Sequence, residues 1–412
     1  METHLTDAYR RAEAGREAEA ILRKCVHCGF CTATCPTYQL FGDELDGPRG
    51  RIYLIKQVLE GARPTAKTRL HLDRCLTCRA CETTCPSGVK YGELLEVGRE
   101  AVAAQLPRTG ADAMMRGALK AVLPRPMLFA ALLKAGQVVR PVLPAALKAK
   151  VPAWQEAGPW PVATHARRML ALAGCVQPAL RAGINAAAAR VLDRLGVSLV
   201  EAKGAGCCGA VRHHLDDPAG GLDDARRNID AWWPYVEAGC EAIVVTASAC
   251  GVEVKDYGRL LHDDAAYAQK AERVSALARD VSEVVAAEGE KLAAQLGVPR
   301  GLTFTKVAFH SPCTLQHGQR VKGVVETLLQ RAGYEVTPVA DSHLCCGSSG
   351  TYSLLLPEIA RELRRNKLTA LGAGGPAVIA SANIGCIGHL QEGSDLPVRH
   401  WIELIDERLA RQ

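Results

Sequence analysis

The chain lacks long apolar runs. No stretch of 18 or more apolar residues occurs in its 412 residues, because Arg, Lys, Gly or Pro interrupts each candidate. A helix that crosses a bilayer needs about 20 apolar residues, so no membrane-spanning helix is predicted. The first seven residues include acidic side chains and no apolar segment of the kind that a secretory signal needs. We therefore expect the chain in a reducing cytoplasm.

Strong charge of one sign is also missing. The chain has 50 Lys and Arg against 44 Asp and Glu, which gives a formal net charge of +6 and a pI near 8.5. This excess is spread along most of the sequence and is too mild for a nucleic-acid-binding surface. No nucleic-acid partner is expected.

Cysteine, in contrast, is abundant, with 17 residues. In a reducing compartment thiols stay free, and clustered cysteines bind metals more often than they form disulfides. Eight of them form two copies of the motif C-x2-C-x2-C-x3-C-P, which is typical of bacterial ferredoxins that carry two [4Fe-4S] clusters. The copies are Cys25, Cys28, Cys31, Cys35 and Pro36, and then Cys75, Cys78, Cys81, Cys85 and Pro86.

In this motif three closely spaced cysteines surround one cluster, and the fourth serves the other cluster. We therefore predict two crossed ligand sets: Cys25, Cys28, Cys31 and Cys85 for the first [4Fe-4S] cluster, and Cys75, Cys78, Cys81 and Cys35 for the second. Zinc is the alternative, although zinc sites usually close two separated C-x2-C pairs. The 39 residues between Cys35 and Cys75 leave room for a helix, which favours an all-α domain.

The remaining cysteines reveal an internal repeat. Cys175 precedes the pair in Cys207-Cys208-Gly209 by 32 residues, and Cys313 precedes the pair in Cys345-Cys346-Gly347 by the same distance. Cys250 follows Cys208 by 42 residues, and Cys386 follows Cys346 by 40. Each copy, here called a CCG domain, alternates strand and helix patterns, which favours α/β units with parallel strands. The expected strands are 168–173, 198–202 and 241–247, then 306–310, 335–339 and 377–382.

The predicted fold is therefore an α+β multidomain protein, in which an N-terminal all-α two-cluster ferredoxin-like domain is followed by two α/β CCG repeats. The expected units are a ferredoxin domain at 1–106, a basic Pro-punctuated linker at 107–165, a first CCG domain at 166–264, a helical connector at 265–304 and a second CCG domain at 305–412.

The CCG cysteines have two interpretations. The sets Cys175, Cys207, Cys208 and Cys250, and Cys313, Cys345, Cys346 and Cys386, offer soft ligands for a further iron-sulfur or redox centre. Alternatively they are free cysteines buried in the α/β core. His389 follows Cys386 by three residues and is either a further ligand, a proton donor or a locally bonded side chain.

A segment at 204–209 matches the glycine spacing G-x-G-x-x-G of dinucleotide sites. The second copy keeps the paired cysteines and loses the glycine spacing, so the element that recurs is CCG and no nucleotide site is predicted. The linker carries Arg125, Lys134, Arg140 and Lys150 between apolar residues. This stretch either packs against a partner or lies on an anionic membrane surface, and its prolines exclude one long helix.

Together these motifs resemble the family of glycolate oxidase iron-sulfur subunits. The resemblance covers the whole chain and is carried by Cys35-Pro-Thr-Tyr38, Gly47-Pro-Arg-Gly-Arg-Ile52, Ala173-Gly-Cys-Val-Gln-Pro178, Cys207-Cys-Gly-Ala210 and Asn383-Ile-Gly-Cys386. The wider family includes subunits of anaerobic glycerol-3-phosphate dehydrogenase, of lactate utilisation complexes and of heterodisulfide reductase.

The resemblance implies an electron-transfer subunit of a membrane-associated oxidoreductase complex. FAD-binding partner subunits would oxidise glycolate to glyoxylate, and this chain would pass the electrons to a quinone at the cytoplasmic face of the inner membrane. The sequence shows no nucleophile–base pair, so the catalytic residues are expected on a partner. Another hydroxy acid or glycerol 3-phosphate as substrate, or a thiol-disulfide reductase using the CCG sites, are the alternatives. Glu253 and His389 replace the final cysteine of a heterodisulfide-reductase-type C-x2-C, so five-thiolate clusters are not expected.

Overall fold

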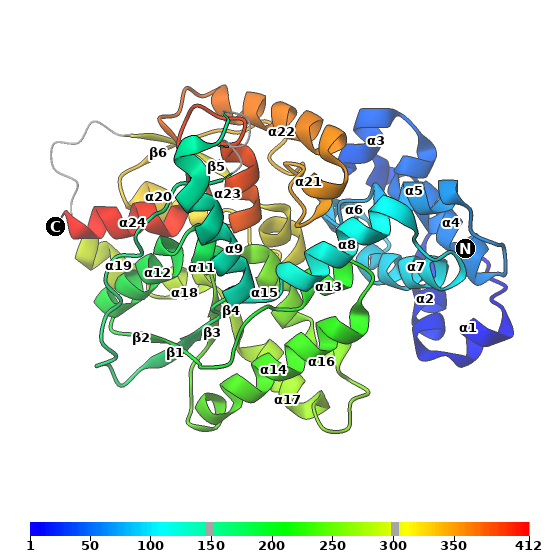
Figure 1. The fold of residues 1–412 in the computed structure, drawn as a ribbon, viewed down its shortest axis with the longest axis horizontal. Coiled ribbons are helices and arrows are strands. Elements are labelled where there is room, and N and C mark those ends of the chain that lie inside the picture. Colours follow the sequence, from blue (N-terminus) through cyan, green and yellow to red (C-terminus); the bar gives the residue numbers. More distant parts are fainter. Residues whose placement is uncertain (145–147, 149–150, 298–304, 412) are drawn as a thin grey trace.

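A computed structural model describes residues 1–144, 148, 151–297 and 305–411 (Figure 1). Parts of the predicted linker and connector, with Lys150, lie outside the described residues. Helices near the N-terminus form one end of the molecule, and two sheets surrounded by helices form the rest (Figure 1). This arrangement agrees with the predicted α+β fold class.

Every regular element described before residue 107 is helical, as predicted. Pro36 and Pro48 stand at the first turns of their helices, where a missing backbone N–H costs no hydrogen bond. Ile21, Ile55 and Leu95 are buried in the core that these helices share. The elements are α1 Asp7–Arg11, α2 Glu13–Lys24, η1 Phe30–Thr34, α3 Pro36–Phe41, η2 Glu44–Asp46, α4 Pro48–Leu59, α5 Ala66–Asp73, α6 Ala80–Thr84 and α7 Tyr91–Gln105.

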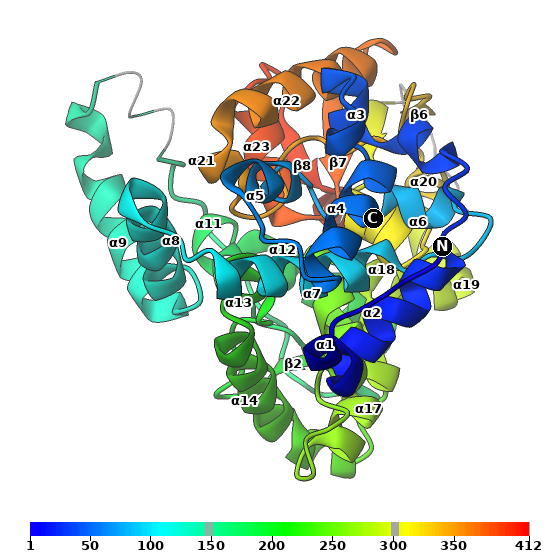
Figure 2. The same ribbon diagram turned by 90° about the vertical axis from the view of Figure 1, so that its right-hand side faces the viewer.

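Two helices follow, α8 (Gly110–Val122) and α9 (Pro126–Val139), with a short turn η3 (Arg140–Val142). Pro124 and Pro126 separate the helices, as the sequence predicted, and the pair is bent by 104°. No single described helix is long and apolar enough to cross a bilayer; by length and composition, only this bent pair passes such a test. Figure 2 shows the pair projecting from one side of the molecule.

Both sheets consist of four parallel strands in the same order. In the first sheet, β2 (Ser198–Glu201), β1 (Arg168–Ala171), β3 (Ile243–Val245) and β4 (Ala278–Asp280) lie side by side in that order. In the second, the order is β6 (Glu335–Thr337), β5 (Lys306–His310), β7 (Val378–Ser381) and β8 (Val398–His400). The shared topology agrees with the repeat that the cysteine spacing indicated.

The edge strands β4 and β8 were not predicted. Each has three residues, which is too short for an alternating pattern to stand out. Strand β4 comes from the segment predicted to be a helical connector and completes the first sheet.

Helices surround both sheets. Those described after residue 166 are α11 Gln177–Leu180, α12 Gly183–Arg194, α13 Ala210–His214, α14 Pro218–Glu237, α15 Ser248–Lys255, α16 Tyr257–Leu260, α17 Ala268–Leu277, α18 Val281–Ala287, α19 Gly289–Leu296, η4 Thr314–Gly318, α20 Val324–Arg331, α21 Tyr352–Leu355, α22 Pro357–Gly372, α23 Ile384–Gln391 and α24 Trp401–Ala410.

The two CCG domains share one apolar core. Residues of α12 and α24, one from each domain, are buried in the same cluster. Arg190 and Asp406 join these helices through an ion pair of 2.6 Å, and His400 Nε2 lies 2.9 Å from the Thr246 carbonyl oxygen. The shared core fixes the position of the two sheets relative to each other. It therefore also fixes the relative positions of their carboxyl ends, where the CCG cysteines lie.

Candidate metal centres

The first cavity gathers thiols from both ferredoxin motifs. Cys25, Cys28, Cys31 and Cys85 line it, together with Cys81 and apolar groups of Val26, Phe30, Ile52 and Val89. Cys85 belongs to the second motif and joins three cysteines of the first, as the crossed scheme requires. Four thiols around an apolar cavity fit the ligand set of a [4Fe-4S] cluster.

The second cavity contains the complementary set. Its lining includes Cys35 from the first motif and Cys75, Cys78 and Cys81 from the second, together with Thr37, Arg51 and Tyr91. Cys81 and Tyr91 line both cavities, so the two sites share a wall. The structure therefore brings together each predicted set of four thiols and places the two sets next to each other.

The two cysteine loops have the same backbone conformation. His27 and Gly29 in the first loop, and Thr77 and Arg79 in the second, all have positive φ angles, at 56°, 86°, 50° and 57°. Three of these residues are not glycine and are therefore strained in this region of φ. The repeated conformation turns the chain tightly enough for cysteines three residues apart to face one cavity.

Burial makes several of these thiols weak acids. It raises the pKa of Cys31 to about 11 and raises the pKa values of Cys78 and Cys81 well above the usual value of a thiol. Metal ligands are thiolates, and a cation at the site is what stabilises the deprotonated form.

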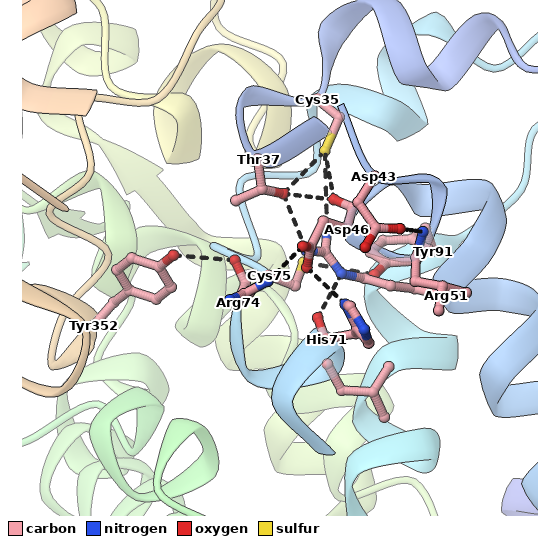
Figure 3. Close-up of polar contacts among 12 residues, drawn as sticks. Cys35, Thr37, Asp43, Asp46, Arg51, His71, Arg74, Cys75, Tyr91 and Tyr352 are labelled. Atoms are coloured by element: carbon pink, nitrogen blue, oxygen red, sulfur yellow. Dashed lines mark hydrogen bonds and ion pairs between the residues drawn. The ribbon is translucent and has the colours of Figure 1, made fainter. Parts of the chain in front are cut away.

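A buried polar network lies beside the second cavity (Figure 3). Arg51, which is 1% exposed, donates to the His71 carbonyl oxygen at 2.7 Å and to Thr37 Oγ1 at 3.0 Å. Asp46 is fully buried. Its Oδ1 lies 3.5 Å from Arg51 Nη2 and 3.0 Å from His71 Nδ1, and its Oδ2 lies 2.7 Å from Arg74 Nη1. One buried carboxylate is thus paired with two arginines next to the site.

Two side chains of this region point hydrogens at the cavity sulfurs. The Tyr91 hydroxyl donates to Cys75 Sγ at 3.5 Å, and Arg51 Nη1 lies 4.0 Å from Cys35 Sγ (Figure 3). Hydrogen bonds and positive charge at ligand sulfurs are among the factors that set the reduction potential of an iron-sulfur cluster. Sequence reasoning missed this network, because its members are up to 56 residues apart in the sequence, as Cys35 and Tyr91 are.

The second ferredoxin motif packs directly on the second CCG domain. Cys78 shares an apolar cluster with Cys313 and Cys345, and Leu76, Ala80, Tyr352, Ala360 and Leu363 complete it. Ser349 Oγ donates to the Leu76 carbonyl oxygen at 2.7 Å. The Tyr352 hydroxyl donates to the Arg74 carbonyl oxygen at 3.1 Å. The second cavity and the second CCG site are therefore neighbours.

The structure assembles the four predicted cysteines of the second CCG domain. Cys313 Sγ lies 3.8 Å from Cys345 Sγ, and the Gly347 backbone N–H donates to Cys345 Sγ at 3.5 Å. The sulfurs of Cys346 and Cys386 and a ring nitrogen of His310 all lie within 4.8 Å of one another. Sequence reasoning missed His310; its position at the carboxyl end of a predicted strand was the available signal.

The first CCG set is also assembled, and all four cysteines are in it. The neighbouring thiols of Cys175 and Cys208 lower the pKa of Cys207 to about 3, and the Gly209 backbone N–H donates to Cys207 Sγ at 3.5 Å. The neighbouring thiols of Cys207 and Cys250 raise the pKa of Cys208 well above the usual value of a thiol. Cys207 is fully buried, so a disulfide substrate has no access to its sulfur in this structure.

Three further residues, His389, Glu253 and Cys240, have local partners. His389 Nε2 lies 3.1 Å from the Ala360 carbonyl oxygen, and Glu253 pairs with His213 at 2.5 Å. Cys240 lies outside the CCG sets, and its sulfur is 3.3 Å from the Ala242 carbonyl oxygen in an apolar core. Packing and hydrogen bonding within the fold account for all three.

The crossed arrangement makes a direct prediction. Cys85→Ser removes a thiol from the first cavity, so we expect loss or conversion of the cluster that Cys25, Cys28 and Cys31 hold, while the second cluster persists. Iron analysis should then show a loss of at most about four of the roughly eight ferredoxin irons, and EPR of the dithionite-reduced protein should show which cluster signal is lost or changed. Cys240→Ser is the matched control and should change neither signal. Loss of the cluster held by Cys75, Cys78 and Cys81 instead would contradict the scheme.

The buried network predicts a stability effect. Asp46→Asn leaves Arg51 without its buried counter-charge, and breaking a buried ion pair costs about 3–5 kcal/mol. Anaerobic urea unfolding of the cluster-loaded protein should show a loss of this size in the free energy of unfolding. Glu44→Gln removes an equal charge from the half-exposed pair with Arg49 and should cost less than about 1 kcal/mol. Equal losses in the two variants would refute the role assigned to Asp46.

Comparisons with known proteins agree with this division of the chain. Residues 21–89 match a family model described as a 4Fe-4S dicluster domain, and residues 169–255 and 307–391 each match a model described as a cysteine-rich domain. The glycolate oxidase iron-sulfur subunit of Escherichia coli (strain K12) is 56% identical over 414 aligned residues, which cover 100% of both chains.

More distant relatives match most or part of the chain. The probable glycolate oxidase iron-sulfur subunit of Bacillus subtilis (strain 168) is 28% identical over 408 residues, covering 92% of this chain and 90% of its own. Lactate utilization protein A of Bacillus licheniformis is 24% identical over 245 residues, covering 57% of this chain and 97% of its own. With two four-thiol cavities, two CCG domains and full-length similarity at 56% identity, the chain belongs to the family of glycolate oxidase iron-sulfur subunits.

Proposed function

We propose that the chain is the electron-transfer subunit of a glycolate oxidase. Flavin-binding partner subunits oxidise glycolate to glyoxylate, which releases two electrons and two protons, and this chain carries the electrons onward one at a time to a quinone. The observation that supports this most directly is the pair of four-thiol cavities with a common wall at Cys81 and Tyr91.

In this proposal Cys25, Cys28, Cys31 and Cys85 hold one [4Fe-4S] cluster, and Cys75, Cys78, Cys81 and Cys35 hold the other. When bound, the clusters supply one-electron storage and transfer. Beside the second cavity, Arg51 and Asp46 form a buried ion pair, and the Tyr91 hydroxyl donates to Cys75 Sγ. Cys28 is exposed at the first cavity, which suits contact with an electron donor on another subunit.

The entry side of the chain has an exposed apolar rim. Val26 is 68% exposed and Phe30 61% exposed, and both line the first cavity. Large exposed apolar side chains next to a redox site are typical of a surface that a partner covers. We assign this rim to the flavin-binding partner. The exit side lies at the second CCG domain, where Cys78 packs against Cys313 and Cys345.

Coexpression with candidate flavin subunits tests the proposal. The purified complex should reduce an artificial dye when glycolate is added, with lower rates for lactate and glycerol 3-phosphate. Phe30→Asp should lower glycolate-dependent reduction of the clusters by about tenfold, because a buried charge at the rim weakens the contact by a kcal/mol or more.

Leu354→Asp is the matched control, since Leu354 is 57% exposed and lies on the second CCG domain. This variant should retain the activity of the unmodified complex. Activity with lactate or glycerol 3-phosphate but none with glycolate would reject the substrate, and no activity with any of the three would reject the function.

Helices α8 and α9 support peripheral contact with the cytoplasmic face of the inner membrane. Met127 is 88% exposed, Val138 73% and Leu132 52%, and Arg125 and Lys134 are exposed beside them. Apolar side chains flanked by cations suit an anionic lipid surface. The quinone acceptor that we propose dissolves in the same membrane.

This contact predicts binding to lipid vesicles. The full chain should float with vesicles that contain anionic phospholipid and bind neutral vesicles more weakly. Leu132→Glu combined with Val138→Glu should weaken binding by about tenfold or more, because burying one such side chain contributes about 1.5–3 kcal/mol. Leu354→Glu again serves as the control and should bind normally. Unchanged flotation of the double variant would rule out α9 as the membrane contact.

A further inference from the structure

One pair of neighbouring residues at the carboxyl ends of the strands differs in character between the two CCG domains. Strand β5 pairs His310 with Ser381 of β7. In the first domain β1 pairs Ala171 with Val244 of β3, so the next residues, Leu172 and Val245, occupy the places of His310 and Ser381.

Cysteine positions confirm this equivalence. Leu172 precedes Cys175 by three residues, and His310 precedes Cys313 by three; Val245 and Ser381 each precede the last cysteine of their set by five. A buried apolar pair in one copy is therefore a buried histidine and serine in the other.

His310 is held in one orientation with one nitrogen free. The residue is 2% exposed, and its Nδ1 lies 2.9 Å from Ser381 Oγ. Its Nε2 is buried and has no hydrogen-bond partner among the described residues. Leaving a buried polar atom unpaired costs about 1–3 kcal/mol, so a ligand at this atom would recover stability.

Other polar side chains around this site have partners. Lys367 Nζ donates to the Asp341 carbonyl oxygen at 2.7 Å, and His389 Nε2 lies 3.1 Å from the Ala360 carbonyl oxygen. Asn383 Nδ2 lies 3.4 Å from Cys386 Sγ. His310 is thus a buried side chain of this site that has an unpaired ring nitrogen.

The surroundings of His310 match those of metal-bound histidines. A ring nitrogen of His310 and the sulfurs of Cys346 and Cys386 lie within 4.8 Å of one another. When Nδ1–H donates to Ser381 Oγ, Nε2 keeps its lone pair, and metal-ligating histidines usually have such an outer partner on the second nitrogen. Thiolate and imidazole together suit zinc or the iron of an iron-sulfur centre.

We propose that His310 is a nitrogen ligand, with Cys346 and Cys386, of a metal centre in the second CCG domain, and that the first CCG domain has no nitrogen ligand at the equivalent place. Cys313 and Cys345 provide the remaining thiols of the site. The two repeats then differ in ligand chemistry. This proposal does not depend on the substrate of the complex, because ligation is measured without turnover.

The test uses the full chain, purified anaerobically after growth with ¹⁵N-histidine. Metal analysis first measures iron and zinc in excess of the ferredoxin irons. Pulsed EPR then detects directly bound histidine nitrogen if the excess metal is iron, and X-ray absorption at the zinc edge detects it if the metal is zinc. We expect a histidine nitrogen signal in the unmodified chain, and its loss in His310→Leu and in His310→Gln.

His389→Gln is the matched control, because His389 is a buried histidine beside the same cysteines whose Nε2 already has a partner. It should keep the nitrogen signal. His310→Leu gives the second copy the residue that the first copy has at this position. If circular dichroism shows that the leucine variant does not fold, His310→Gln takes its place. No metal beyond the ferredoxin irons, no nitrogen ligand in the unmodified chain, or a signal that persists in a folded His310 variant would each overturn the proposal.

Discussion

The packing of Cys78 with Cys313 and Cys345 is one of the interactions that hold the ferredoxin domain against the CCG domains. It joins the second ferredoxin motif to the second CCG domain through a small apolar cluster that excludes water. At the same interface, the Tyr352 and Ser349 hydroxyls donate to the backbone carbonyl oxygens of Arg74 and Leu76. If this contact opened, two buried sulfur sites would be exposed to solvent and separated from each other.

The two ferredoxin cavities are unequal because of what surrounds them. The first opens at Cys28 between exposed Val26 and Phe30. The second lies between the second CCG domain and the Arg51–Asp46 network. There the cost of burying charged groups is reduced by the ion pair, and the Tyr91 hydroxyl donates to Cys75 Sγ. An exposed site suits exchange with another subunit, and a buried site suits transfer within the chain. The order of the sites from surface to interior is thus a result of packing.

The sequence predicted the parts of this design that depend on local spacing. The cysteine spacing alone gave both four-thiol sets, and the repeated offset of 32 residues gave the two sheets with a common topology. The prolines near residue 125 predicted the break between α8 and α9. Strands β4 and β8 were missed because three residues carry too little pattern. The Asp46 network and His310 were missed because their partners come together only through tertiary packing.

The central claim is that electrons from glycolate enter this chain through its ferredoxin cysteines. Rapid-freeze EPR of the assembled complex, sampled after glycolate is added without any external acceptor, tests it most directly. The account predicts that the signals of two reduced [4Fe-4S] clusters appear as the partner flavin is reoxidised, and that Cys85→Ser removes one of them. A flavin that is fully reduced by glycolate while both clusters stay oxidised would contradict the account.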